Sequence, residues 1–92
     1  MKAVWTRAAV RDLQNARDYI ARENPEAARE TALKIVDAAE RISQFPEIGR
    51  AGRVNGTREF VVSGTSYLII YRLRGKTIHF LRVLHGRQQW PR

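Results

Sequence analysis

The residues best suited to chemistry lie at the end of the last strand-like segment of the chain. His85, Gly86 and Arg87 follow one another there, and Arg82 precedes them by three positions. Histidine transfers protons near neutral pH, and arginine stabilises the negative charge of a phosphate. Attack of a ribose 2′-hydroxyl on its neighbouring phosphate needs a base, an acid and cations. With Arg58 as a further cation, these residues leave one enzymatic chemistry open, the cleavage of RNA.

The same residues also allow a structural interpretation. A histidine that ends a strand commonly makes a structural hydrogen bond, and His79, in the middle of the segment, favours that reading more strongly. Trp90, followed by Pro91, is expected to pack the C-terminus onto the domain. Arg50 and Arg53 lie in a glycine-rich stretch and are free to reach a ligand, or serve as plain surface arginines.

The sequence lacks the residues that other catalytic sites and metal sites need. The chain has no cysteine, which excludes disulfides, thiolate zinc sites and cysteine nucleophiles. It has no glycine-rich phosphate loop and no recognisable serine–histidine–aspartate order. The two histidines lie six positions apart with no third ligand nearby. We therefore expect neither a metal nor a cofactor.

The positive charge is concentrated in the second half of the chain. Residues 6–44 carry seven bases and seven acids, whereas residues 45–92 carry nine bases against Glu47 and Glu59, a net of +7 out of +8 overall. Eight of those nine bases are arginine, which suits planar contact with phosphate or carboxylate. A one-sided field of this kind predicts an anionic partner, either nucleic acid or an acidic protein.

Length and hydropathy fit one small domain spanning residues 1–92. With 43% hydrophobic and 28% charged residues, the composition is typical of a globular protein. No apolar run approaches the roughly 20 residues of a membrane span, and the apolar N-terminal stretch is too short for a signal peptide. We expect a cytoplasmic protein without a membrane partner.

The elements that must position the site follow from local signals. Residues 1–5 read as a strand, and Thr6 caps a helix over residues 7–22. Asn24 and Pro25 start a second helix that runs to about residue 44, and the short link requires an antiparallel hairpin. Residues 45–52 contain a proline and two glycines and are predicted to be irregular. Strands over 57–62, 67–73 and 77–84, separated by short turns, predict an antiparallel meander in an α+β fold, with the helices covering one face of the sheet.

Alternation along the strands predicts which side chains face a partner. If Leu73 pairs with Thr77, the helices cover Tyr67, Ile69, Tyr71, Leu81 and Val83, and Glu59 also faces the helices. A one-residue slip would exchange the faces. In the simplest register of the first hairpin, Arg58 and Phe60 join the open face. The open face is then both apolar and basic, which is typical of a binding surface. The predicted partner-binding residues combine this face with the basic segments beside it: Arg50, Arg53, Arg58, Leu68, Ile70, Arg72, Phe80, Arg82, Arg87 and Trp90.

The chain resembles the RelE/ParE superfamily of toxins from bacterial type II toxin–antitoxin modules. The likeness rests on the element order and on ordered fragments: Ala21 with PEAA at 25–28, FPEIGR at 45–50, GTRE at 56–59, YLIIYR at 67–72, and LHGR at 84–87 with Trp90 and Pro91. The resemblance implies a toxin that arrests growth and is neutralised by a cognate antitoxin with an acidic binding segment. The predicted partner-binding residues would then contact the antitoxin or the target.

The superfamily divides by target, and the resemblance implies one of two. RelE-like members cleave messenger RNA on the ribosome with scattered lysines and arginines and a C-terminal tyrosine, whereas ParE-like members poison DNA gyrase. Here Lys76 is the one lysine of the second half, and no tyrosine follows Tyr71. The ending also looks more like the ParE side. This favours a non-nuclease gyrase toxin, with a ribosome-dependent mRNA endonuclease using His85, Arg87, Arg58 and Arg82 as the alternative.

Overall fold

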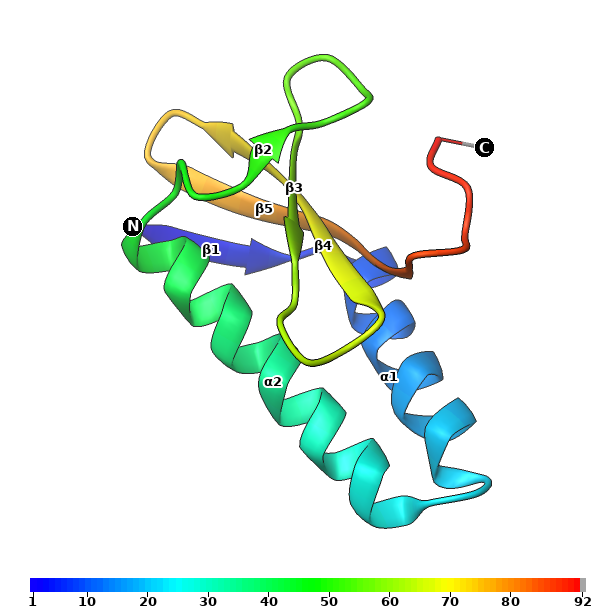
Figure 1. Cartoon of the computed structure of the whole chain (residues 1–92). Coiled ribbons are helices and arrows are strands. Elements are labelled where there is room, and N and C mark those ends of the chain that lie inside the picture. Colours follow the sequence, from blue (N-terminus) through cyan, green and yellow to red (C-terminus); the bar gives the residue numbers. More distant parts are fainter. Residues whose placement is uncertain (92) are drawn as a thin grey trace.

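A hairpin of two helices packs on one face of a five-stranded sheet in the computed structural model, which describes residues 1–91 (Figure 1). The elements are β1 (Lys2–Trp5), α1 (Arg7–Ala21), α2 (Pro25–Gln44), β2 (Arg50–Ala51), β3 (Arg58–Val61), β4 (Tyr67–Arg74) and β5 (Thr77–His85). This order confirms the predicted α+β class. The two-residue strand β2 lies within the segment that was predicted to be irregular, so that expectation was wrong at Arg50 and Ala51.

The strands are arranged in the order β1-β5-β4-β3-β2. β1 runs parallel to β5, and the other neighbouring pairs are antiparallel. The two helices form the crossover between β1 and the rest of the sheet, because a parallel neighbour needs a long connection. β5 therefore lies inside the sheet, flanked by β1 and β4. Within the described residues, no helix is long and apolar enough to cross a membrane.

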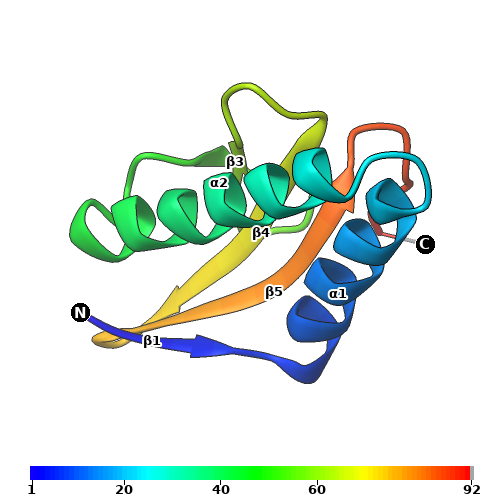
Figure 2. The ribbon, with the colours of Figure 1, turned by 90° about the horizontal axis from the view of Figure 1, so that it is seen from below.

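Both helices start where the sequence predicts. The Thr6 side chain accepts a hydrogen bond from the Ala9 amide at 3.1 Å, and Asn24 accepts one from the Ala27 amide at 3.0 Å. Pro25 occupies the start of α2, where its missing N–H costs nothing. These local signals fix the ends of the hairpin that Figure 2 shows lying against the sheet.

The pairing of β4 with β5 differs from the predicted register at the turn, where Arg74 pairs with Thr77, and again at a β-bulge. Leu73 pairs with Ile78 rather than with Thr77, and the pairing shifts between Ile70 and Tyr71. Leu81 is left without a partner on β4, because Tyr71 pairs with Phe80 and Ile70 with Arg82. A bulge inserts one extra residue and so reverses the alternation beyond it.

The bulge places β5 side chains from both sides of it in one core. Ile78 and Phe80 before it, and Val83 after it, are at most 2% exposed and belong to the helix-facing cluster. Ile35, Ala38, Ala39 and Ile42 of α2 and Ala9 and Ala16 of α1 fill the other side of this cluster. The expectation that Phe80 lines the open face was therefore wrong.

The pairing of β3 also differs from the expected faces. Phe60 pairs with Ile69 and packs against the helix-facing core, so it does not lie on the open face as predicted. Arg58 shares the helix-facing side with its partner Tyr71. Glu59 pairs with Ile70 and faces away from the helices, opposite to the expectation. The observed pairing of β3 with β4 is thus one residue out of step with the predicted faces, which exchanges the two faces.

The face that points away from the helices is only partly open. Glu59, Ile70 and Leu84 are at most 3% exposed although none of them belongs to the helix-facing cluster. Arg53 contacts Glu59 through its amide and the Trp90 carbonyl through its guanidinium, at 3.0 and 3.5 Å. The segment after β2 and the C-terminal tail thus meet on this side of the sheet.

Candidate functional site

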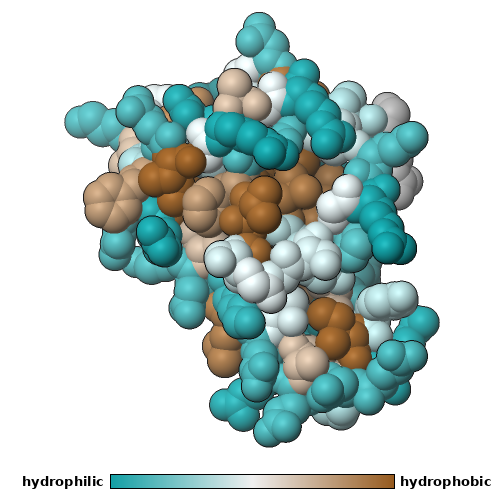
Figure 3. Space-filling view, in the orientation of Figure 1, coloured by the Kyte–Doolittle hydropathy of each residue, from teal (hydrophilic) through white to brown (hydrophobic). Residues whose placement is uncertain are grey.

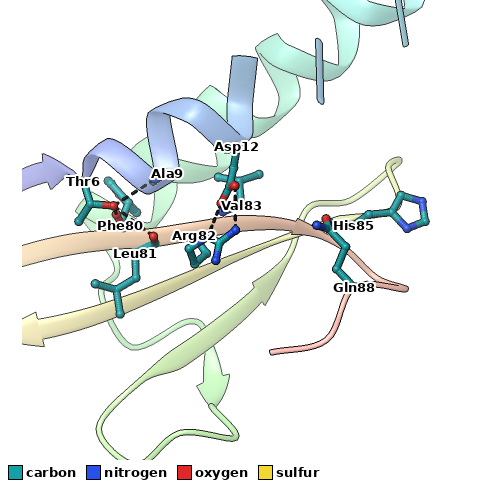
Figure 4. Close-up of polar contacts among 9 residues, drawn as sticks. All are labelled: Thr6, Ala9, Asp12, Phe80, Leu81, Arg82, Val83, His85 and Gln88. Carbon is teal, nitrogen blue, oxygen red and sulfur yellow. Dashed lines mark hydrogen bonds and ion pairs between the residues drawn. The ribbon is translucent and has the colours of Figure 1, made fainter. Parts of the chain in front are cut away.

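Arg82 is held by an acid on α1. Its Nε and Nη2 donate to the two carboxylate oxygens of Asp12 at 2.6 and 3.0 Å, and the Val83 amide donates to the same carboxylate at 3.0 Å (Figure 4). The hydrogen bond that Arg82 donates to Asp12 raises the pKa of the guanidinium above its already high value. Arg82 therefore remains charged, but two of its donors are occupied inside the protein.

Arg58 binds the segment between α2 and β2. Its Nη1 donates to the carbonyls of Glu47 and Gly49 at 3.2 and 2.8 Å. The Tyr71 hydroxyl donates to the Pro46 carbonyl at 2.7 Å and accepts from the Gly49 amide at 2.9 Å. Burial raises the pKa of Tyr71, while the Gly49 amide and the Arg58 charge oppose that rise. Arg58 therefore has a structural function in this fold.

Glu59 organises the predicted binding arginines of the β2 region. Its carboxylate is 3% exposed and accepts from Arg50 Nη2 at 3.3 Å and from the Arg53 amide at 3.0 Å. A buried carboxylate needs such partners because desolvation penalises its charge. The Arg50 side chain is itself 62% exposed, and Arg53 is exposed. Both guanidinium groups can therefore still contact a partner.

His85 and Arg87 lie beside a pocket at the end of β5. The pocket has a volume of ≈ 390 Å³. Its lining consists of Asp12, Asn15, Ala16, Tyr19, Tyr67, His85, Arg87 and Gln88. The His85 ring packs edge-on against Tyr67 with a centroid distance of 5.4 Å, and its Nδ1 accepts the Arg87 amide at 3.2 Å. Burial, aided by nearby Tyr19, raises the pKa of the Tyr67 hydroxyl.

The four residues of the predicted ribonuclease set do not converge. Arg58 lies opposite Tyr71 on β4, whereas His85 lies opposite Tyr67. Those two β4 positions are about 13 Å apart at about 3.3 Å per residue. In Figure 4 the His85 ring points away from the Asp12–Arg82 pair. Only His85 and Arg87 lie together at one pocket.

The remaining predicted binding residues differ in exposure. Ile70 and Phe80 are buried, and Leu68 is half-buried. Arg72 is half-buried, and its Nε is a buried donor without a hydrogen-bond partner. Trp90 is half-buried, and its indole N–H is a buried donor without a hydrogen-bond partner. Across residues 1–91, no three histidine or acidic side chains cluster as metal ligands would.

Sequence reasoning missed Asp12 and Tyr71 as organising residues. Asp12 lies between Ala9 and Ala16 on one face of α1, and both alanines are buried. An acid inside a buried alanine stripe is the signal that it has a partner on the sheet. For Tyr71 no such local signal exists, because its hydroxyl meets a segment more than twenty residues earlier in the chain.

Comparison with known proteins identifies the family. The family model described as the ParE toxin of the type II toxin–antitoxin system, parDE, matches residues 3–90. The toxin candidate Y4kP of Sinorhizobium fredii is 37% identical over 87 residues, covering 95% of this chain and 90% of that protein. The toxin RelE2 of Caulobacter vibrioides is 37% identical over 85 residues, covering 92% and 94%.

A solved structure agrees with these relatives. A chain of the chromosomal ParDE toxin–antitoxin system from P. aeruginosa superposes with a TM-score of 0.83 and 30% identity, covering 92% of this chain and 95% of that one. Family model, sequence relatives and fold agree over nearly the full length. This protein therefore belongs to the ParE family of toxins from type II toxin–antitoxin systems.

Proposed function

We propose that this toxin inhibits DNA gyrase by binding it as a protein and that a cognate antitoxin neutralises it. The observation that supports a binding mechanism is that two arginines of the predicted ribonuclease set make hydrogen bonds within the protein. Arg82 is bonded to Asp12, and Arg58 to two loop carbonyls. These cations are thus oriented by the fold, away from a common reacting phosphate. A site that stabilises transition-state charge needs its donors free and convergent.

The antitoxin proposal rests on the charge of the second half of the chain. Residues 45–92 carry a net charge of +7. Arg50, Arg53 and Arg87 remain accessible, and the related solved structure comes from a ParDE toxin–antitoxin system. An acidic antitoxin segment would be attracted to this surface, and such steering weakens with added salt. Of the predicted binding residues, these three arginines are the ones we retain as direct contacts.

A gyrase assay tests the mechanism. Purified toxin is added to gyrase and relaxed plasmid, and both supercoiling and cleaved DNA are measured, with a parallel cell-free translation reaction. We expect loss of supercoiling or trapped cleaved DNA, with translation unaffected. Normal supercoiling by gyrase in the presence of toxin that arrests growth in cells would reject the proposal.

A ribosome-dependent ribonuclease is the second candidate. It is favoured by the adjacency of His85 and Arg87 at a pocket and by a relative that is named RelE2. This candidate predicts transcripts cut within codons during growth arrest, and loss of cutting in His85→Ala and Arg87→Ala. Intact transcripts in arrested cells would reject it.

A further inference from the structure

The segment between α2 and β2 is fixed from inside the protein. Four hydrogen bonds reach its backbone from Tyr71 and Arg58, at 2.7 to 3.2 Å. The Ile48 amide closes a turn onto the Phe45 carbonyl at 3.1 Å. Gly49 is needed here, since a Cβ at this position would lie 2.6 Å from the Tyr71 hydroxyl oxygen. The backbone of residues 45–49 is thus held in one conformation by a buried tyrosine and an arginine.

This fixed backbone displays large apolar side chains to solvent. Phe45 is 59% exposed, Ile48 36% and Met1 55%. Together with Pro46 and Leu73 they line a hollow of ≈ 420 Å³, which we call the Phe45–Ile48 patch. Figure 3 shows brown side chains gathered on the left of the view, where Figure 1 places the end of α2 beside the N-terminus.

Rigid display of exposed apolar side chains is a property of binding surfaces. Phenylalanine and isoleucine side chains are usually buried in a folded protein. In this loop, Tyr71 and Arg58 hold the backbone from the inside, and the loop's own apolar side chains remain exposed. A loop that is already ordered loses little conformational entropy when a partner binds it. Large side chains on such a loop are the kind of anchors that dominate interfaces.

The charges around the patch indicate the character of the partner. Lys2, Arg74 and Lys76 are exposed at the same end of the sheet, where Lys2 and Arg74 both pair with Thr77. Glu47 is the one acid that lines the hollow. Three bases against one acid favour a partner surface with acidic side chains around its apolar ones.

We infer that the Phe45–Ile48 patch is where this toxin docks on gyrase, onto a segment of that enzyme whose apolar side chains are flanked by acidic ones. The inference rests on the gyrase proposal above and adds the surface that makes the contact. It assigns target binding to the α2–β2 segment and not to the His85 end of the sheet.

Paired variants test this assignment. Phe45→Ser with Ile48→Ser removes the anchors, and Leu33→Ser with Val36→Ser on α2 is the matched control, because those side chains are 54% and 46% exposed. Circular dichroism and thermal melting establish that both double variants are folded. We expect the patch variant to inhibit gyrase supercoiling at least about tenfold less potently, and the control to inhibit like the unmodified toxin.

A charge-reversal pair tests the stated chemistry. Lys76→Glu is expected to weaken inhibition and to reduce its salt sensitivity, whereas Lys34→Glu on α2 is expected to leave both unchanged.

Each outcome is decisive. If the patch variant and the control variant are both folded and both inhibit gyrase like the unmodified toxin, the docking inference is overturned and the gyrase proposal stands. An equal loss of inhibition in both variants has the same consequence. If the unmodified toxin does not inhibit gyrase, the gyrase proposal fails and the docking inference fails with it.

Discussion

Asp12 on α1 and Arg82 on β5 form a two-bonded ion pair across seventy residues of sequence. Asp12 also accepts the Val83 amide at 3.0 Å. β1 accompanies β5 only as far as Phe80, so the outer edge of β5 beyond it has no strand neighbour. Asp12 supplies the acceptor that a neighbouring strand would otherwise provide, and thereby joins α1 to the sheet.

Replacing Asp12 should therefore destabilise the fold. In Asp12→Ala the Val83 amide and the Arg82 guanidinium lose their acceptor, and Asp12 and Arg82 are only 11% and 26% exposed. We expect the free energy of unfolding to fall by about 1–3 kcal/mol. Urea denaturation measures it, with Asp18→Ala as control because that side chain is 72% exposed. Equal stability of the two variants would show that the pair adds nothing.

The two helix caps should differ in their contribution. The Thr6 hydroxyl caps α1 and also donates toward the Phe80 and Leu81 carbonyls at 2.9 and 3.1 Å, whereas Asn24 makes a local cap bond only. We expect Thr6→Ala to cost about 2 kcal/mol and Asn24→Ala about 1 kcal/mol. Thr6→Ser keeps the hydroxyl and should recover most of the loss in chemical denaturation. A smaller loss in Thr6→Ala than in Asn24→Ala would show that the contacts of the Thr6 hydroxyl with β5 add no stability.

Gly49 should tolerate no side chain. A Cβ there would lie 2.6 Å from the Tyr71 hydroxyl oxygen and 2.8 Å from its ring, which is buried. Overpacking of this kind costs about 1–3 kcal/mol, so Gly49→Ala should lower the melting temperature clearly. Gly86→Ala is the control, since its nearest contact would be an ordinary 3.5 Å. A Gly49→Ala protein as stable as Gly86→Ala would mean that the Tyr71 ring can move aside.

Stability should decline in alkaline solution, partly through Tyr71. Burial raises the pKa of Tyr71 in the folded protein above its ordinary value of 10.0. The folded state then holds the phenolic proton more tightly than the unfolded state. The contribution of Tyr71 to stability is therefore complete below about pH 10 and is lost as pH rises toward the folded pKa.

Phenylalanine substitutions isolate this effect. Tyr71→Phe should be less stable at neutral pH, because two hydrogen bonds are lost, and should lose less stability between about pH 9 and 11 than the unmodified protein. Tyr67→Phe should behave similarly in slope, because the pKa of Tyr67 is raised as well. Tyr19→Phe, at a side chain that is 67% exposed, serves as control for Tyr71, because Tyr19 contributes to the raised pKa of Tyr67 but not to that of Tyr71. Unchanged alkaline slopes in both buried-tyrosine variants would refute the assignment.

Much of the fold was predictable because its signals are local. Thr6 and Asn24 start the helices because their side chains accept hydrogen bonds from backbone amides of the first turn. Glycine-bearing turns separate β3, β4 and β5. The likeness to the RelE/ParE superfamily rested on the same ordered fragments, and the family is confirmed. The roles of individual arginines were not predictable in this way. Whether Arg58 or Arg82 is free depends on a carbonyl or carboxylate that the chain brings near from another element.

The sequence by itself determined the order of the elements, the ends of both helices and the basic second half, since each depends on neighbouring residues or on composition. Tertiary structure decided the strand register, because pairing is non-local and a single unpaired residue, Leu81, reverses the alternation of β5. That reversal buries Phe80 with Val83 in one core. The pairing of β3 turns Glu59 to the opposite face, where Arg50 and Arg53 meet it. The identity of the exposed side chains was therefore a property of the folded sheet, even though its strands could be recognised from the sequence.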